Sequence, residues 1–404
     1  MQEILTVNEL FSGIGAQRKA LDRLGIAHEV VGVCEIDKYA IQSYEAIFGK
    51  TYNYGDICTA ERLEYADLWT YSFPCQDISV AGNQKGISSE TRSGLLYQVQ
   101  RLLEVAKDEG KLPKYLLLEN VKNLVGKKFK SQFDDWLFYL DQLGYDTYWQ
   151  VLNAKHYGIP QNRERVFAIS IRKDLNQSFE FPKPEELKIR LKDILEDEVD
   201  EKYYLKQSMV DYFIKNSLNN EEKGNGFRFK PHNPQGADIA FAITTRAGAR
   251  MDDNFVLNED LNERPFFQFD KDNIKIYQLG RGKNKGGFKE LAPTITSSKY
   301  EHNNFIVGMF NPYNNTKIVD VAPTQTTGNR NATSSSSVLI AEHKFEDIRI
   351  RKLTPLECWR LMGFDDEDFR KAEASGVSNT QLYKQAGNSI CVNVLEKIFE
   401  NLYK

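Results

Sequence analysis

The sequence has few cysteines, no long apolar run and no strong excess of one charge. Its five cysteines, at positions 34, 58, 75, 358 and 391, include no CxxC pair, so we expect reduced thiols, no disulfide framework and no bound metal. Apolar stretches such as Tyr115–Leu118 fall far short of the roughly 18 residues that a membrane helix needs. Residues 1–8 show no basic start and no small-residue cleavage site, which predicts a cytoplasmic protein without a signal peptide.

What is present is an ordinary composition of 404 residues, 41% hydrophobic and 27% charged, which excludes collagen, coiled-coil and wholly disordered chains. The 53 basic and 57 acidic side chains leave a net charge of -4, which argues against a strongly basic nucleic-acid binder. The charge is uneven, because Phe179–Lys223 holds 12 acidic and 8 basic residues whereas Gly224–Lys344 holds 15 basic and 12 acidic ones. The second stretch therefore permits a phosphate-facing surface.

Residues 1–175 alternate short β-branched or aromatic runs with helical patterns, which is typical of consecutive βαβ units. We therefore predict a doubly wound α/β domain with a mainly parallel sheet. The expected strands are Ile4–Phe11, Val30–Cys34, Leu68–Phe73, Tyr115–Leu118, Thr147–Leu152 and Arg165–Ile171. The expected helices are Gln17–Leu24, Lys38–Phe48, Gly94–Lys107 and Phe129–Leu143, each followed by a glycine as a stop signal.

The middle of the chain, from about Phe179 to Phe345, shows little helical periodicity and contains an internal repeat. The three copies are Ile239–Thr245 before Asn254-Phe-Val256, Leu291–Ser297 before Asn304–Val307, and Val321–Thr327 before Val338-Leu-Ile340. This spacing predicts strand, turn, strand units that present polar loops from a small β-rich domain. The loops hold Arg246, Arg250, Lys299 and Arg330, which suit contacts with phosphates and base edges. The alternative is that they are solvated loops of a structural domain.

After Phe345 the helical pattern returns. Thr354-Pro-Leu-Glu357 has the spacing of a capping box with proline at the first helical position. The tail from Ser378 to Tyr403 is expected to form a helix that packs back on the first domain. This order predicts one α/β domain interrupted by a long insertion.

Three strand ends in the first domain carry residues suited to an adenosine-containing cofactor. Two glycines in Phe11-Ser-Gly-Ile-Gly15 let the backbone approach a ligand, Glu35 is placed to accept ribose hydroxyls, and Asp56 is placed to accept from an adenine amino group. A plain turn is the alternative for this loop. A nicotinamide site would need a third glycine, and Arg18 stands at that position.

The ends of the next strands carry a second set of candidate functional residues. Cys75 follows Pro74 at a strand end, where α/β folds bind ligands, and the long Gln76–Ser93 loop after it is typical of a lid. A lone cysteine is otherwise most often a buried core residue. Glu119 ends the following strand, and Arg163 and Arg165 are expected to share one face beside it. A helix-capping carboxylate and a structural salt bridge are the alternatives.

Together these motifs resemble those of the C5-cytosine DNA methyltransferase family, of bacterial or phage type. The resemblance covers roughly residues 1–175 and 346–404, and the middle region falls where the family keeps its variable target-recognition domain. Ala16 is a small departure, because many members have a second glycine there. The matching segments are Phe11–Gly15, Pro74-Cys75-Gln76, Glu119-Asn120-Val121, Gln161-x-Arg163-x-Arg165, Arg351–Arg360 and Gln385–Ile390.

The resemblance implies a mechanism. Cys75 is expected to add to C6 of a cytosine flipped out of duplex DNA, and Glu119 to contact or protonate N3. Arg163 and Arg165 would hold the base oxygen and the sugar-phosphate. The implied methyl donor is S-adenosyl-L-methionine, the product S-adenosyl-L-homocysteine. The residues expected to line its pocket are Phe11, Ser12, Gly13, Ile14, Gly15, Glu35, Ile36, Asp56, Ile57, Pro74, Leu95, Asn388 and Ser389.

The implied partner is double-stranded DNA, in a monomeric enzyme of a bacterial or phage-infected cell, with a cognate restriction endonuclease as a candidate second partner. The predicted domains are 1–178 completed by 384–404 for catalysis and cofactor binding, 179–345 for target recognition, and 346–383 as a hinge. The residues expected to contact DNA are Gln76, Ser79, Lys85, Arg92, Gln161, Arg246, Arg250, Lys299 and Arg330.

Three other functions stay open at this point. An RNA enzyme of the same superfamily is the nearest, but its usual Cys-Phe-Thr signature and short recognition region are missing here. A catalytically silent paralogue is disfavoured by the intact Cys75 and Glu119. A nicotinamide oxidoreductase is the third.

Overall fold

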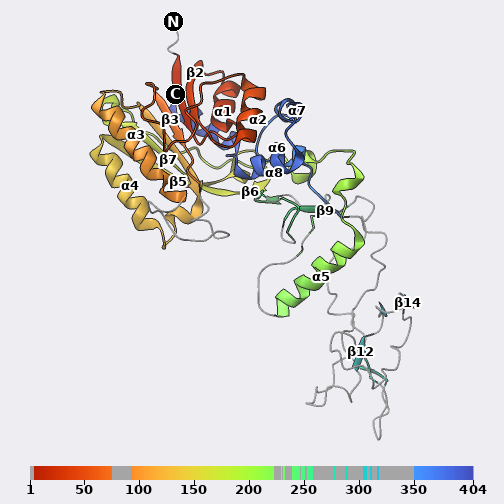
Figure 1. Cartoon of the computed structure of the whole chain (residues 1–404). Helices are drawn as coiled ribbons and strands as arrows, with labels where there is room; N and C mark the ends of the chain where they lie inside the picture. Colours follow the sequence, from red (N-terminus) through yellow and green to blue (C-terminus); the bar gives the residue numbers. More distant parts are fainter. Residues whose placement is uncertain are drawn as a thin grey trace. The chain divides into compact units, whose positions relative to one another are not determined.

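The computed structural model describes residues 4–74, 92–222, 229, 231–232, 239–245, 247–250, 253–257 and 350–403, with five short strands between 276 and 317. The chain divides into two compact units, Met1–Glu259 with Arg349–Lys404, and Asp260–Ile348. No helix among the described residues is long and apolar enough to cross a membrane. Figure 1 follows the chain through both units.

The first unit is built on a six-stranded sheet of order β2-β1-β3-β4-β7-β5. Neighbours β2, β1, β3 and β4 are parallel, while β7 runs antiparallel to both β4 and β5. The strands are β1 (Leu5–Leu10), β2 (His28–Cys34), β3 (Leu68–Tyr71), β4 (Tyr115–Val121), β5 (Tyr145–Asn153) and β7 (Glu164–Arg172). The mainly parallel α/β sheet predicted from the sequence is thus confirmed. The expected strand before Asp56 is only a single parallel bridge between Val33 and Asn53.

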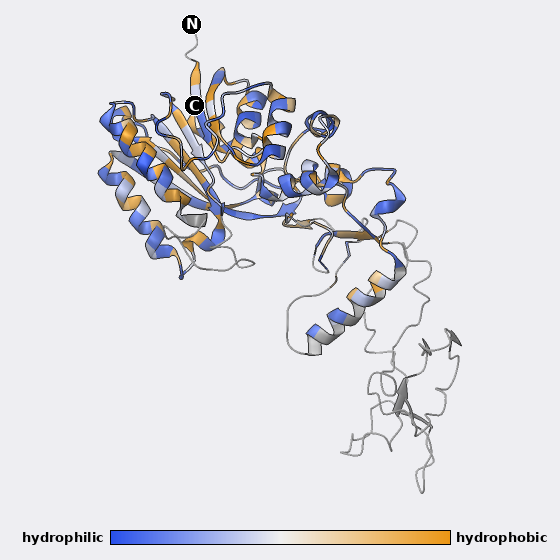
Figure 2. Cartoon of the chain, viewed as in Figure 1, coloured by the Kyte–Doolittle hydropathy of each residue, from blue (hydrophilic) through white to orange (hydrophobic). Residues whose placement is uncertain are grey.

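Both faces of the sheet are buried, because helices cover each of them. Along β4, Leu117 packs in a cluster with α1 and α9, whereas Leu116 and Leu118 pack with α3 and α4. This period of two is why the strands are apolar on both faces. Figure 1 shows α3 and α4 on one side of the sheet and α1 and α2 on the other, and Figure 2 shows hydrophobic residues concentrated in the strands.

The four helices expected in residues 1–175 are all present. They are α1 (Ala16–Leu24), α2 (Lys38–Phe48), α3 (Leu96–Asp108) and α4 (Lys130–Gln142). Gly25 adopts a left-handed conformation with φ 64° and closes α1, as its position predicts. Short 3-10 turns lie at Arg92–Leu95, Lys122–Val125, Ala154–His156, Lys173–Leu175, Leu191–Ile194 and Glu201–Tyr203.

One prediction for the middle region is wrong. A helix, α5 (Gln207–Glu222), lies where little helical character was expected. Its buried Val210 and Phe213 are three residues apart, and Phe213 packs against the rings of Phe229 and Phe255. The helix is therefore stabilised by distant aromatic partners rather than by a strong local pattern.

The first repeat forms the strand, turn, strand unit that was expected. Its strands β8 (Ala240–Phe241) and β9 (Phe255–Leu257) pair not with each other but with β6 (Gln161–Asn162) and β15 (Ile350–Lys352). Asn254 joins them, accepting from Phe241 N at 2.8 Å and donating to Phe241 O at 3.0 Å. Leu291–Ser297 of the second copy and the whole third copy lie outside the described residues.

The second unit is described only by short strands. Strands β11 (Gly287–Lys289), β10 (Ile276–Gln278) and β12 (Asn304–Ile306) form an antiparallel sheet in that order. Strands β13 (Phe310–Asn311) and β14 (Thr316–Lys317) form an antiparallel pair.

The capping box predicted at Thr354 is confirmed at the start of α6 (Pro355–Arg360). The Glu357 side chain is fully buried and accepts from Thr354 N at 2.8 Å. It also receives two hydrogen bonds from Arg351, at 2.9 and 2.8 Å. The next helices along the chain are α7 (Asp366–Ala374) and α8 (Asn379–Asn388).

The expectation of one helix from Ser378 to Tyr403 is wrong, because α8 stops at Asn388 and α9 (Val392–Leu402) starts after Cys391. Ser389 has an extended backbone. The groups at the break find tertiary partners instead, since Ser389 O accepts from Arg163 at 2.8 Å and Val392 N donates to Met362 O at 2.9 Å. As predicted, the tail packs on the first domain, through α9 against α1.

Glu9 provides a stability prediction. Its carboxyl group is fully buried on β1, accepting from Tyr44 Oη at 2.6 Å and Arg18 N at 3.0 Å, and burial raises its pKa to about 7. The folded state then binds a proton that the unfolded state has lost. Stability should therefore fall as pH rises from about 4.5 to above 7, by on the order of 3 kcal/mol from this group. Glu9→Gln should remove that fall in urea unfolding between pH 5 and 8, while exposed Glu29→Gln keeps the wild-type slope. Parallel slopes for all three proteins would contradict the assignment.

Candidate active site

The glycine loop after β1 is held by the end of β2. Phe11 N donates to Cys34 O at 2.8 Å, and Glu35 accepts from Gly13 N at 2.9 Å. The same Glu35 carboxylate accepts from Ile36 N at 2.9 Å and from Asp37 N at 2.8 Å. Phe11 has φ 59°, an uncommon left-handed value for a residue with a side chain, which often marks a functional loop. Glu35 therefore fastens the loop while part of its surface remains open.

A small hollow lies beside this loop. Its lining includes Ser12 and Glu35, which the sequence singled out, and Tyr44, Thr51 and Asn53, which it did not. Asn53 orients Glu35, donating to Glu35 O at 3.0 Å and accepting from Glu35 N at 3.2 Å. No motif marks these three residues, and only their place next to the carboxyl end of β2 would have suggested them.

The other residues expected at the cofactor differ in exposure. Asp56, Ile36 and Asn388 are exposed, whereas Ile14, Ile57 and Ser389 are buried. Pro74 and Leu95 are half-buried after β3 and before α3. Exposed polar groups beside a buried loop suit a ligand that is recognised from the carboxyl edge of the sheet.

Glu119 and Arg165 meet at the carboxyl end of β4. The register pairs Val121 with Arg165 and Glu119 with Phe167, so Glu119 and Arg165 are diagonal neighbours on one face. Arg165 Nε lies 3.3 Å from Glu119 Oε1. Ser72 Oγ, three residues before Cys75, donates to Glu119 Oε2 at 3.1 Å.

The Glu119 carboxyl group is 7% exposed. Burial raises its pKa above the ordinary range for glutamate, and the nearby Arg165 and Arg163 charges and the Ser72 hydrogen bond oppose the shift. A carboxyl group in this setting keeps its proton to higher pH than an exposed one. Such a group remains available as a proton donor to a higher pH than an exposed glutamate.

The side chains of Arg163 and Gln161 bond to backbone groups of other segments. Gln161 is fully buried and Arg163 is 4% exposed. The Arg163 guanidinium donates to backbone carbonyls of Ile243, Gly387 and Ser389 rather than to Glu119. Of the two arginines expected to converge on the carboxyl group, Arg165 forms an ion pair with it, whereas Arg163 acts on it as a nearby charge.

The residues expected to contact DNA are described only in part. Of those expected to contact DNA, Arg250 is exposed, Arg92 begins the 3-10 turn before α3, and Gln161 is buried. The remainder, Gln76, Ser79, Lys85, Arg246, Lys299 and Arg330, lie outside the described residues, as does Cys75. Within the described ranges no cluster of three or more His, Cys, Asp or Glu is arranged to hold a metal.

Comparison with known proteins places this chain in a family. The family described as C-5 cytosine-specific DNA methylase matches residues 5–404. The type II methyltransferase M2.ScrFI of Lactococcus lactis subsp. cremoris is 33% identical, with 99% of each chain covered. The orphan methyltransferase M.SPRI of Bacillus phage SPR is 34% identical, with 98% of this chain and 97% of the relative covered.

Solved structures agree on the fold. S. pombe Dnmt2 methyltransferase superposes with a TM-score of 0.59 at 20% identity, covering 98% of this chain and 97% of that one. A mutant of Spodoptera frugiperda DNMT2 gives 0.62 at 17% identity, covering 99% and 100%. The family match and the full-length relatives together show that the chain belongs to the C-5 cytosine-specific DNA methylase family and is a DNA cytosine-5 methyltransferase.

Proposed function

We propose that the chain flips one cytosine out of duplex DNA within a short specific sequence and methylates C5 through a covalent bond between Cys75 and C6. The observation that carries the proposal is the buried Glu119 carboxyl group, held by Ser72 and Arg165 at the strand end next to the Cys75 segment. A buried acid there suits a base whose N3 must be protonated.

The chemistry follows from the weak nucleophilicity of cytosine C5. The Cys75 thiolate adds to C6 while Glu119 gives a proton to N3, so that electron density moves to C5. C5 then takes the methyl group, a water molecule removes the C5 proton, and the bond between Sγ and C6 breaks to release the thiolate. Glu119 recovers its proton from N3 in the last step, which returns the protein to its starting state.

Arg165 has two roles in this scheme. Its charge opposes the rise in the Glu119 pKa, and its guanidinium lies beside the place where the base must sit. A planar guanidinium suits the O2 carbonyl of cytosine and an adjacent phosphate. Arg163 does not share this role in the geometry described above, since its guanidinium is committed to backbone carbonyls.

The glycine loop and the Glu35 carboxylate that holds it suit S-adenosylmethionine, which would supply an activated methyl group when bound. Glu35 is half-buried, so its carboxylate can meet ribose hydroxyls, and the Gly13 backbone that it holds carries no side chain. Exposed Asp56 is available to an adenine amino group.

Glu35→Ala should weaken binding of S-adenosylhomocysteine by about 10- to 150-fold. The variant removes the charged acceptor proposed for the ribose hydroxyls, and one hydrogen bond to a charged group contributes about 1.5–3 kcal/mol. It also leaves the N–H groups of Gly13, Ile36 and Asp37 without that acceptor. Isothermal titration calorimetry checks this, with Glu29→Ala on the strand that precedes Glu35 as the control. Equal affinities in the two variants would remove Glu35 from the cofactor site.

We assign target recognition to residues 179–345, because the polar turn of the first repeat carries the exposed Arg250. The catalytic segments are 1–178 and 384–404, with 346–383 as a hinge. A monomer in the cytoplasm is proposed as the working form. One relative is called a type II methyltransferase, a name that suits an enzyme with a cognate restriction endonuclease. The other is called an orphan methyltransferase, a name that suits an enzyme without one.

Cytosine-conversion sequencing tests the function directly. Purified protein and S-adenosylmethionine are incubated with a random-sequence duplex and, separately, with total tRNA. Protected cytosines within one short DNA motif are expected. Protection in tRNA alone would move the protein to RNA, and protection in neither would overturn the proposed reaction.

A further inference from the structure

The side chains of Gln161 and Arg163 hold the backbone of Ile243 from both sides. Gln161 Oε1 accepts from Ile243 N at 3.1 Å, and Arg163 Nη1 donates to Ile243 O at 3.0 Å. The adjoining strands β6 and β8 pair in register, Gln161 with Ala240. Ile243 is therefore fixed to the segment that leads into β7.

The same two side chains also hold the C-terminal part of the chain. Gln161 Nε2 donates to Leu361 O at 2.7 Å, and Arg163 Nη2 donates to Gly387 O at 3.1 Å and Ser389 O at 2.8 Å. We call these contacts the clasp: Gln161 and Arg163 with the backbones of Ile243, Leu361, Gly387 and Ser389.

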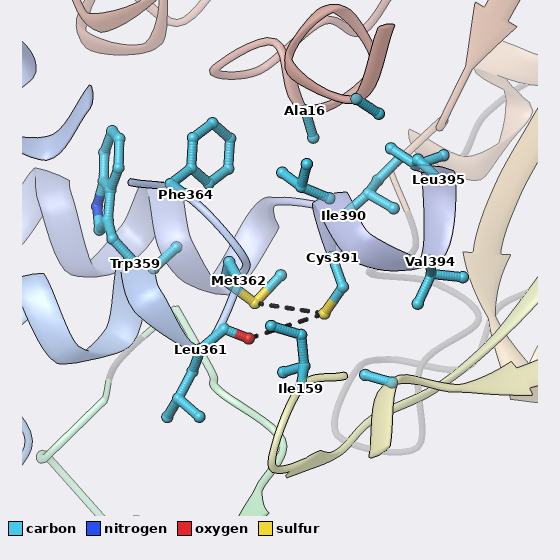
Figure 3. Close-up of a cluster of buried hydrophobic side chains, with 14 of the residues drawn as sticks. Ala16, Ile159, Trp359, Leu361, Met362, Phe364, Ile390, Cys391, Val394 and Leu395 are labelled. Atoms are coloured by element: carbon cyan, nitrogen blue, oxygen red, sulfur yellow. Dashed lines mark hydrogen bonds between the residues drawn. The ribbon is translucent and has the colours of Figure 1, made fainter. Parts of the chain in front are cut away.

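The helix break inside the clasp is itself well packed. Figure 3 shows Ile390 below Ala16 of α1, and Cys391 beside Met362 and the Leu361 carbonyl. The Cys391 thiol lies 3.9 Å from Leu361 O and 4.0 Å from Met362 Sδ. The residues on the C-terminal side of the clasp are therefore packed in the core. The clasp attaches Ile243 to this fixed part of the molecule.

Ile243 enters the turn of the first repeat, residues 244–253, of which 244–245, 247–250 and 253 are described. Asp253 closes this turn, accepting from Thr244 Oγ1 at 3.2 Å, Ala249 N at 3.0 Å and Arg250 N at 2.8 Å. The turn also lies directly against α8, because a Cβ atom on Gly387 would come within 2.4 to 2.6 Å of the Thr244 and Thr245 backbone. The clasp and Gly387 therefore set where the turn and its exposed Arg250 lie.

Arg163 stands two residues before Arg165, about 7 Å along an extended chain. One short segment thus carries both the guanidinium that contacts Glu119 and the guanidinium that holds the turn. The distance between the catalytic carboxyl group and the recognition turn is set by this segment.

We propose that Arg163 and Gln161 are positioning residues for sequence specificity, which hold the 244–253 turn at a fixed offset from the flipped cytosine without touching DNA. The proposal rests on the proposed function of Glu119 and of the turn. Its consequence is a separation of effects. Loosening the clasp should widen the methylated motif while the chemistry at the cognate sequence continues.

Arg163→Lys isolates this role, because lysine keeps the charge near Glu119 but lacks the planar fork that reaches carbonyls in two directions. Gly387→Ala displaces the turn from its other side and leaves the guanidinium intact. Matched controls are Arg172→Lys at the far end of β7, where Arg172 pairs with Asp174, and Thr380→Ala on the exposed face of α8.

The experiment measures kcat and KM on the duplex motif found by conversion sequencing and on duplexes with each base pair of that motif changed in turn. Wild type and both controls should discriminate by about 5- to 150-fold per changed base pair. In R163K and G387A, discrimination at the bases read by the turn should fall by about tenfold, with kcat on the cognate duplex within about threefold.

Other outcomes would overturn the proposal. A KM that rises equally for all duplexes in R163K would make Arg163 a phosphate contact. A lower melting temperature with unchanged discrimination would make the clasp merely structural, because a ratio of rates does not depend on the fraction of folded enzyme. Wild type that methylates no duplex would overturn the proposed function and this proposal with it, whereas unchanged discrimination in active variants overturns the proposal alone.

Discussion

Replacing Cys75 by alanine should abolish methyl transfer to duplex DNA, by at least about 10,000-fold, and leave the affinity for S-adenosylhomocysteine within about twofold of wild type. The reason is that C5 becomes nucleophilic only after a thiolate has added to C6. Most of the residues proposed to bind the cofactor lie on other segments, around Ser12 and Glu35. Transfer of a radiolabelled methyl group measures the first quantity, and calorimetry the second.

Cys58→Ala is the matched control, because Cys58 is an exposed thiol of the same domain. It should retain wild-type activity. Methylation by the Cys75 variant at more than a trace would exclude a covalent route through this residue. Loss of S-adenosylhomocysteine binding in the same variant would instead show that the substitution disturbs the fold.

The second large effect is expected at Glu119. Glu119→Gln keeps the shape of the side chain but removes the proton that N3 needs, so kcat should fall by about 100- to 10,000-fold. Its pKa is raised by burial, so the protonated form persists above the ordinary glutamate range and is lost as pH rises through the raised value. Wild-type kcat should therefore decline on the alkaline side, and the residual rate of E119Q should lack that decline.

Glu164→Gln is the control for this experiment, since Glu164 lies at the start of β7 and pairs with Lys122 on the surface. Its pH profile should match that of wild type. An E119Q enzyme that keeps both the wild-type rate and the alkaline decline would remove Glu119 from proton transfer.

Much of the α/β domain was predictable because its signals are local. Lys38–Phe48 was expected as a helix and has those bounds, since its apolar spacing and the following glycine report where one face is buried and where the helix ends. The capping box at Thr354 and Glu357 was predictable for the same reason, because three residues of one turn contain both partners. The meeting of Glu119 with Arg165 followed from the ends of two strands that come together in such a fold.

The errors share one cause, which is that their partners are distant in sequence. Helix α5 depends on Phe229 and Phe255, and the break at Ser389–Cys391 depends on Arg163 and Met362. The spacing of apolar residues indicates which face of an element is buried, but not which distant segment packs against that face. The hollow residues Tyr44, Thr51 and Asn53 were missed for the same reason.

The sequence by itself therefore determined the order of strands and helices in residues 1–175, the family and the set of reactive side chains, because the signals for each lie in residues close together along the chain. Only the tertiary structure decided which way the side chains of these motifs turn. Arg165 contacts Glu119, while Arg163, two residues earlier, is drawn inward by the carbonyls of Ile243, Gly387 and Ser389. A buried guanidinium must find acceptors, and those acceptors come from segments 80 to 226 residues away.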